Sequence, residues 1–164
     1  MTELRIREAA RALVVDDDDR VLLVRFEFPT RTVWAIPGGG IDPGESDHDA
    51  LRRELAEEIG LVDADIGAHL WNRLHIIPFI SGLYDGQRER AYLVRVPIGF
   101  EPQPQFSWEQ LNAERVYELR WWTLPDLRAA VAAGDVFTAP SQLVSLVDDL
   151  FVNGPPASPP DVDP

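Results

Sequence analysis

The chain has no cysteine and no lysine among its 164 residues. The absence of cysteine excludes disulfide bonds, thiolate metal ligands and a cysteine nucleophile. Zinc is also disfavoured, because His48, His69 and His75 lack the short spacing of zinc ligands. All 15 basic residues are arginines. Guanidinium groups suit phosphate recognition, although a biased composition explains the same usage.

Long apolar segments are missing as well. No run of eighteen or more apolar residues occurs, so we expect no transmembrane helix and no membrane partner. The first five residues include the charged Glu3 and Arg5 and lack the apolar core of a secretory signal. We therefore expect a cytoplasmic protein with a single domain, since 164 residues suffice for one core.

The chain also lacks an excess of positive charge. Its formal net charge is −13 and its pI is about 4.5. Nucleic-acid-binding proteins usually carry a basic stripe, and a negative field repels polyanions. We therefore expect no nucleic-acid partner. A small phosphorylated substrate can still bind where metal ions and local arginines reverse the sign.

Apolar patterns predict a mixture of strands and helices. The expected strands cover residues 11–16, 20–26, 34–36, 63–71, 74–80, 89–96 and 117–122. The expected helices begin near Ser46, at Thr123 and at Ser141, and end before Gly60, before Gly134 and at Phe151. Gly38 to Gly40 should form a flexible loop. Residues 153–164 are rich in proline and are predicted to form a disordered tail, with neither helix nor strand.

The most informative segment covers residues 39–61. Glu54, Glu57 and Glu58 stand at positions i, i+3 and i+4, so on a helix they share one face. Like charges at this spacing destabilise a helix by roughly 0.2–0.5 kcal/mol per pair. A solvated helix face is one explanation. The glycines nearby favour a second, a site for a hard divalent cation such as Mg²⁺ or Mn²⁺.

The order of these residues resembles the full signature of the Nudix hydrolases, the MutT-like family. The signature positions are Gly39, Glu45, Arg53-Glu54-Leu55, Glu57-Glu58 and Gly60-Leu61. The resemblance implies an α/β/α sandwich with a mixed β-sheet in residues 1–152. It also implies metal-assisted attack of water on a phosphoanhydride. The implied metal ligands are Glu54, Glu57, Glu58 and the carbonyl of Gly38. Arg53 would orient a glutamate, and Glu45 would pair with Arg53 or with a metal-bound water. The alternative for Glu45 is a favourable negative charge near the helix N-terminus.

The general base is left open by the sequence. Glu57 or Glu58 could remove the proton from water, but an acid outside the signature can take this role in the family. Glu118 is the first candidate, because members of the family often carry an acid just before a similar apolar strand, and Glu114 is the second. Both could equally be surface residues.

In the Nudix family, substrate specificity lies outside the signature. The resemblance implies that Gly39 and Gly40 bring the backbone close to a phosphate. Arginines beside aromatic rings could hold phosphates and stack a base, although core packing is the alternative for each ring. The arginines are Arg25, Arg31, Arg73 and Arg90, and the aromatic residues are Phe26, Phe28, Trp34 and Trp71. Pro78, seventeen residues after Leu61, resembles a feature of the ADP-ribose-hydrolysing branch.

The sequence thus favours a hydrolase of a nucleoside diphosphate linked to another moiety. A nucleoside triphosphate, ADP-ribose and a nucleotide sugar all remain open as substrates. The isoprenoid isomerase branch requires a cysteine and is excluded, while the acidic charge disfavours the RNA-decapping branch. A nucleotide-binding sensor without activity is the alternative function. The apolar residues of the last helix could support a homodimer.

Overall fold

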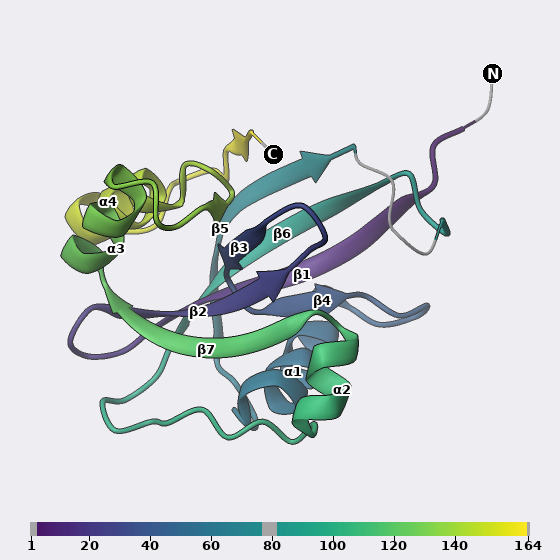
Figure 1. The fold of residues 1–164 in the computed structure, drawn as a ribbon, viewed down its shortest axis with the longest axis horizontal. Coiled ribbons are helices and arrows are strands. Elements are labelled where there is room, and N and C mark those ends of the chain that lie inside the picture. Colours follow the sequence, from purple (N-terminus) through teal and green to yellow (C-terminus); the bar gives the residue numbers. More distant parts are fainter. Residues whose placement is uncertain (1–2, 77–81, 164) are drawn as a thin grey trace.

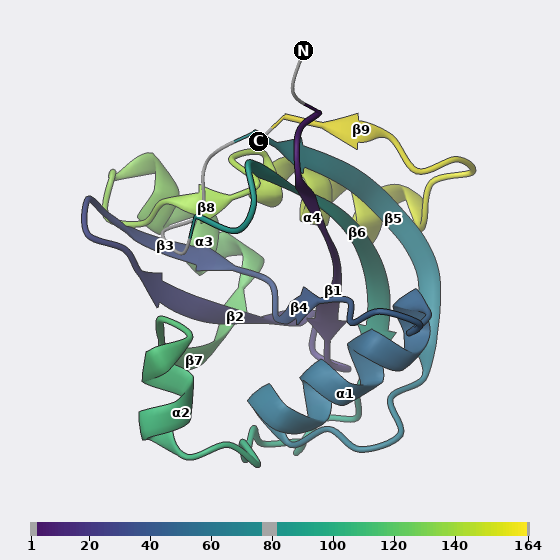
Figure 2. The same ribbon diagram turned by 90° about the vertical axis from the view of Figure 1, so that its right-hand side faces the viewer.

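The computed structural model describes residues 3–76 and 82–163. A strongly curled mixed β-sheet runs through the molecule, with α1 and α2 on one side and α3 and α4 on the other (Figures 1 and 2). Within the described residues the strands are β1 (Ile6–Val15), β2 (Arg20–Glu27), β3 (Thr32–Ala35), β4 (Gly38–Gly40), β5 (Ile66–His75), β6 (Gly86–Arg95), β7 (Val116–Thr123), β8 (Thr138–Ala139) and β9 (Asp161–Val162). The helices are α1 (Asp47–Ile59), α2 (Trp108–Ala113), α3 (Leu124–Ala132) and α4 (Leu143–Asn153).

The sheet combines parallel and antiparallel pairs. Its order is β8-β3-β2-β1-β6-β5-β9, while β4 pairs with β1 and β7 pairs with β2. The long pairing of β1 with β6 is parallel, and those of β5 with β6 and β2 with β7 are antiparallel. The predicted single-domain α/β fold with a mixed sheet is confirmed.

Each face of the sheet has its own core because the side chains of a strand alternate. Leu13 and Leu23 face α3 and α4, and join a cluster with Leu127 and Val147. Val14 and Leu22 face the opposite way, and pack with Leu51, Leu55 and Ile59 of α1. The predicted apolar stripe of this helix is therefore buried, which fixes the orientation of its glutamates.

Local signals fix the ends of α1. The hydroxyl of Ser46 accepts a hydrogen bond from the N–H of Asp49 at 3.1 Å, which satisfies one free donor of the first turn. Gly60 follows the last turn with φ of 73°, a left-handed conformation that favours glycine. Both ends match the sequence prediction.

Several predicted elements need correction. Gly38 to Gly40 form strand β4, because their backbone pairs with β1 at Ala9, Ala10 and Arg11. The strand expected at residues 63–71 and the start of the one expected at 74–80 form one strand, β5. Residues 77–80 of that prediction lie outside the described residues. At the C-terminus, β9 pairs in parallel with β5, so the prediction of no strand there is wrong.

Helix α2 has no counterpart in the sequence prediction. It has six residues, too few to show a helical period, but Ser107 and Gln110 form a complete capping box at its start. Leu111 is fully buried and anchors it to Val24 and Val116. Its C-cap is Glu114, which this helix holds near the glutamates of α1. None of the helices in residues 3–76 and 82–163 is long and apolar enough to cross a membrane.

Candidate active site

The glutamates of α1 pack directly against the glycine strand. A Cβ atom on Gly39 would lie 2.7 Å from the carboxyl carbon of Glu54, so any larger residue there would displace the Glu54 carboxylate. The N–H of Gly38 donates to Glu58 Oε2 at 2.9 Å. Gly38 has φ of 136°, and a Cβ there would lie 2.3 Å from the carbonyl oxygen of Ala10. The glycines thus permit a close approach of strand and helix.

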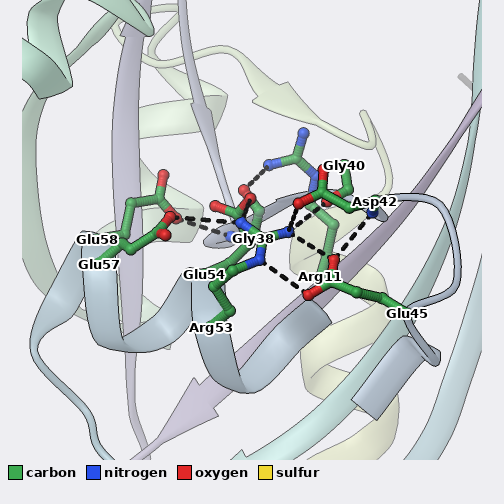
Figure 3. A network of polar contacts seen from close by, with 9 residues as sticks. All are labelled: Arg11, Gly38, Gly40, Asp42, Glu45, Arg53, Glu54, Glu57 and Glu58. Carbon is green, nitrogen blue, oxygen red and sulfur yellow. Dashed lines mark hydrogen bonds and ion pairs between the residues drawn. The ribbon is translucent and has the colours of Figure 1, made fainter. Parts of the chain in front are cut away.

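Arg53 organises the acidic side chains around it (Figure 3). Its Nε and Nη2 donate to the two oxygens of Glu45 at 3.0 and 2.8 Å. Its Nη1 donates to Glu54 at 3.0 Å and lies 3.5 Å from Glu57, while Nη2 also donates to the carbonyl of Gly40 at 3.1 Å. The hydrogen bonds from Arg53 lower the pKa of Glu45 to about 2. Arg53 therefore ties the loop after β4 to the helix.

Burial and nearby negative charge disfavour the charged form of Glu57, Glu58 and Glu114. Glu58 is 2 % exposed, and burial raises its pKa to about 8 against the opposing effects of Gly38 N–H and Arg11. Burial and the charge of Glu54 also raise the pKa of Glu57 and of Glu114. A solvated helix face would not bury Glu58, so that explanation is rejected.

The donor chemistry of this cluster fits a hard divalent cation. The available ligands are carboxylate oxygens and the carbonyl of Gly38, as Mg²⁺ and Mn²⁺ prefer. In the part of the chain that the structure describes, no three acidic or histidine side chains converge on one point. Arg53 bridges Glu54 and Glu57, and Arg11 Nη1 donates to the Gly38 carbonyl at 3.2 Å. A cation would therefore draw these side chains together and offset their mutual repulsion.

The two acids proposed outside the signature are placed differently. Glu118 accepts from Arg25 Nε at 3.1 Å and from Arg120 Nε at 2.8 Å. Its neighbour Leu119 packs in the core beside α1. Because successive strand residues point to opposite faces, Glu118 points away from the helix. Glu114 instead interacts electrostatically with Glu54. The preference for Glu118 over Glu114 is therefore not supported by the geometry.

Three of the four arginines proposed for phosphate binding contact other side chains of the protein. Arg90 forms ion pairs with Asp47 and Glu8 on the face that carries α1. Arg25 pairs with Glu118 and Glu27, and Arg31 lies over the ring of Phe137 at 5.8 Å.

Arg73 is different. It is buried and pairs with Glu89 at 3.2 Å, and Glu89 also binds Arg11.

Of the proposed aromatic residues, Trp34 and Trp71 are core residues, 5 % and 2 % exposed. Phe28 is 43 % exposed and its ring stacks on Phe26 at 6.2 Å. The core alternative therefore holds for the two tryptophans. Pro78 lies outside the described residues.

Sequence reasoning missed Arg7 and Arg11. Arg11 donates to the carbonyl of Gly38. A Cβ atom on Gly40 would lie 2.5 Å from Nη2 of Arg7. Both stand in β1, on the alternation shared with the buried Ala9 and Leu13. The sequence signal that could have found them is a charged residue on a strand face whose other residues are apolar, because charged side chains are rarely buried without a partner.

Comparison with known proteins places the chain in a family. The model of the NUDIX domain matches residues 5–140. An RNA pyrophosphohydrolase from Wolbachia pipientis is 29 % identical over 117 residues, which cover 63 % of this chain and 66 % of that protein. The NAD-capped RNA hydrolase NudC from Mycobacterium tuberculosis is 31 % identical over 134 residues, 80 % of this chain and 37 % of that protein. The chain thus spans less than two thirds of each.

A solved structure supports the fold. The NUDIX domain of Shewanella oneidensis NrtR, complexed with ADP ribose, has a TM-score of 0.63 and 21 % identity, with 92 % of this chain and 90 % of that one covered. The domain match covers the glycine strand, α1 and the strands around them, and every fixed position of the signature is present. The chain belongs to the Nudix family.

Proposed function

We propose that this chain is a metal-dependent hydrolase of a phosphoanhydride bond in a nucleotide. The observation that carries the proposal is the packing of Glu54 and Glu58 against Gly38 and Gly39, with Arg53 holding Glu54 and Glu57 in place. Mg²⁺ or Mn²⁺ held by Glu54, Glu57, Glu58 and the Gly38 carbonyl would neutralise phosphate charge and acidify a bound water.

The protein side chains have distinct roles in this proposal. Arg53 orients the carboxylates of Glu54 and Glu57, and Glu45 fixes the orientation of Arg53 through two hydrogen bonds. Glu114 accepts the proton of the attacking water. Its raised pKa suits a proton acceptor better than an unperturbed carboxylate would. Glu57 is the alternative base, whereas Glu58 is buried and committed to the N–H of Gly38.

The proposed substrate is a small molecule with a nucleoside diphosphate joined to another group. The relatives are named RNA pyrophosphohydrolase and NAD-capped RNA hydrolase, and the structural neighbour is complexed with ADP ribose. A diphosphate next to a nucleoside is common to NAD and ADP ribose. We favour a small nucleotide over RNA, because a net charge of −13 opposes a polyanion.

The alternative function is a sensor that binds a nucleotide without hydrolysing it. Intact glutamates at all three ligand positions favour the enzyme over the sensor. A cytoplasmic location and a homodimer remain proposals. For the latter, α4 exposes Val152 beside its packed face, and light scattering after gel filtration would measure the mass in solution.

A substrate screen tests the proposal. The purified chain would be incubated with ADP-ribose, a nucleotide sugar, nucleoside triphosphates, NAD and 5′-capped RNA, with Mg²⁺, with Mn²⁺ and with EDTA. We expect metal-dependent release of a nucleotide from at least one small molecule. Binding of a nucleotide without turnover in any metal would support the sensor instead.

A further inference from the structure

A cluster of buried polar side chains lies beside the glutamates, on β1, β5 and β6. Arg73, Gln87 and Glu89 are 7 %, 7 % and 6 % exposed. Glu89 accepts from Arg11 Nε at 3.1 Å and from Gln87 Nε2 at 2.6 Å, and it pairs with Arg73 Nη1 at 3.2 Å. Two guanidinium groups therefore share one carboxylate. Buried charge without full compensation is costly, and it is notable in a chain of net charge −13.

One donor of this cluster has no acceptor. Among the described residues, Nε of Arg73 is buried and lacks a hydrogen-bond partner. Its Nη2 lies 3.2 Å from Nδ1 of His75, and burial and Arg73 lower the pKa of this histidine, which favours the neutral ring that can accept this hydrogen bond. An imidazole supplies no negative charge to offset the guanidinium. A buried N–H of a charged group without an acceptor destabilises the folded state, because its lost hydration is not replaced. An anion from outside the chain would supply both the acceptor and the charge.

The cluster borders the candidate active site through the glycine strand. Arg11 Nη1 donates to the carbonyl of Gly38, whose N–H binds Glu58. Figure 3 shows Arg11 and the α1 glutamates gathered around Gly38. Further along β1, Arg7 Nη1 donates to Gln87 Oε1 at 3.0 Å, and its guanidinium lies against Gly40. The arginines thus extend from the strand that contacts the glutamates toward β5.

We propose that Arg7, Arg11 and Arg73 bind the phosphate of the substrate that is not attacked. This inference rests on the proposed function, because the α1 glutamates would then act on the adjacent phosphate of the same diphosphate. Guanidinium groups present several donors in one plane and match phosphate oxygens. Arg73 Nε would donate to a phosphate oxygen, and the excess positive charge would be neutralised.

Binding of inorganic pyrophosphate to the full chain in EDTA tests this site without catalysis. Titration calorimetry should show saturable binding to the wild-type chain. We expect Arg73→Gln to weaken it about tenfold, the loss of one charged hydrogen bond. Glu89→Gln should strengthen it by a similar factor, because it removes the competing negative charge. Arg128→Gln is the matched control, since Arg128 pairs with Asp148 at 3.2 Å and both are half exposed.

The opposite effects of the two variants separate binding from folding. A purely structural cluster would lose affinity in both, or in neither, and either result overturns the proposal. Thermal unfolding of each variant reports whether it is folded. If neither variant folds, the wild-type titration still decides, because absence of saturable pyrophosphate binding overturns the proposal.

Kinetics connect the site to the substrate. Pyrophosphate should inhibit hydrolysis competitively, and Arg73→Gln should raise KM more than it lowers kcat. Non-competitive inhibition would place pyrophosphate at a separate site and reject the proposal that these arginines bind a phosphate of the substrate. Pyrophosphate binding without hydrolysis of any nucleotide would instead leave the anion site standing and remove the proposed activity.

Discussion

The two faces of strand β4 carry opposite charge. On one face the carboxylate of Glu54 occupies the space of a Gly39 side chain, and on the other the guanidinium of Arg7 occupies that of Gly40. Alternation along a strand sends neighbouring residues to opposite faces. Three glycines therefore bring an acidic cluster and a basic cluster within one strand thickness of each other. That arrangement suits a substrate whose reacting phosphate meets the acids while its neighbour meets the arginines.

The acidic face should dominate turnover. We expect Glu57→Gln to lower kcat by about 10³-fold or more, because it removes a charged ligand or base while keeping the shape. Glu58→Gln should have a similar effect, with the fold retained in both. Steady-state assays with Mg²⁺ and Mn²⁺ measure the change. Near-wild-type rates in both variants would reject the mechanism.

Glu114 and Glu118, both outside α1, are two competing candidates for the general base. We expect Glu114→Gln to lower kcat by roughly 10²-fold, as loss of a general base does. Glu118→Gln should change kcat by less than about threefold, because Glu118 pairs with Arg25 and Arg120 on the other face of its strand. Turnover of the two variants, assayed side by side, gives the answer. The reverse order would restore Glu118 as the base.

Matched glycine substitutions probe the two faces of β4 directly. Gly39→Ala should push the Glu54 carboxylate and lower kcat, whereas Gly40→Ala should displace the Arg7 guanidinium and raise KM. Both neighbours are ends of flexible side chains, so we expect about tenfold effects rather than unfolding. Gly38→Ala would meet backbone atoms of Ala10 and should destabilise the fold itself. Equal effects of Gly39→Ala and Gly40→Ala on kcat and KM would contradict separate roles for the two faces of β4.

The acidic face should also give the metal-free protein an unusual pH dependence. The pKa of Glu58 is about 8 in the folded state and about 4.3 in an unfolded chain. Between these values the folded state binds more protons, so stability falls as pH rises from about 5 to 8. Thermal unfolding in EDTA should show this fall, and Glu58→Gln should flatten it. Added Mn²⁺ should raise the unfolding temperature most at the upper end of this range. A flat profile in the wild-type chain would contradict the burial of Glu58 as an acid.

Much of the fold can be predicted from short-range patterns in the sequence. The period of Leu51, Leu55 and Ile59, the cap at Ser46 and the stop at Gly60 define α1, and hence which face carries the glutamates. Other features depend on partners far along the chain. Gly38 to Gly40 look like a loop until β1 supplies hydrogen bonds. Helix α2 is too short to show a helical period in the sequence. Strand β9 forms because its backbone pairs with β5.

The sequence by itself determined the family, the acidic face of α1 and the kind of ion that such oxygen ligands prefer, because these depend on residue types at fixed local spacing. Only the tertiary structure decided which distant residues join that face. It brought Glu114 to the glutamates and turned Glu118 away, and it set Arg11 and Arg73 around Glu89. The pairing of strands, and the side to which each residue then points, set these positions, and no local pattern contains that information.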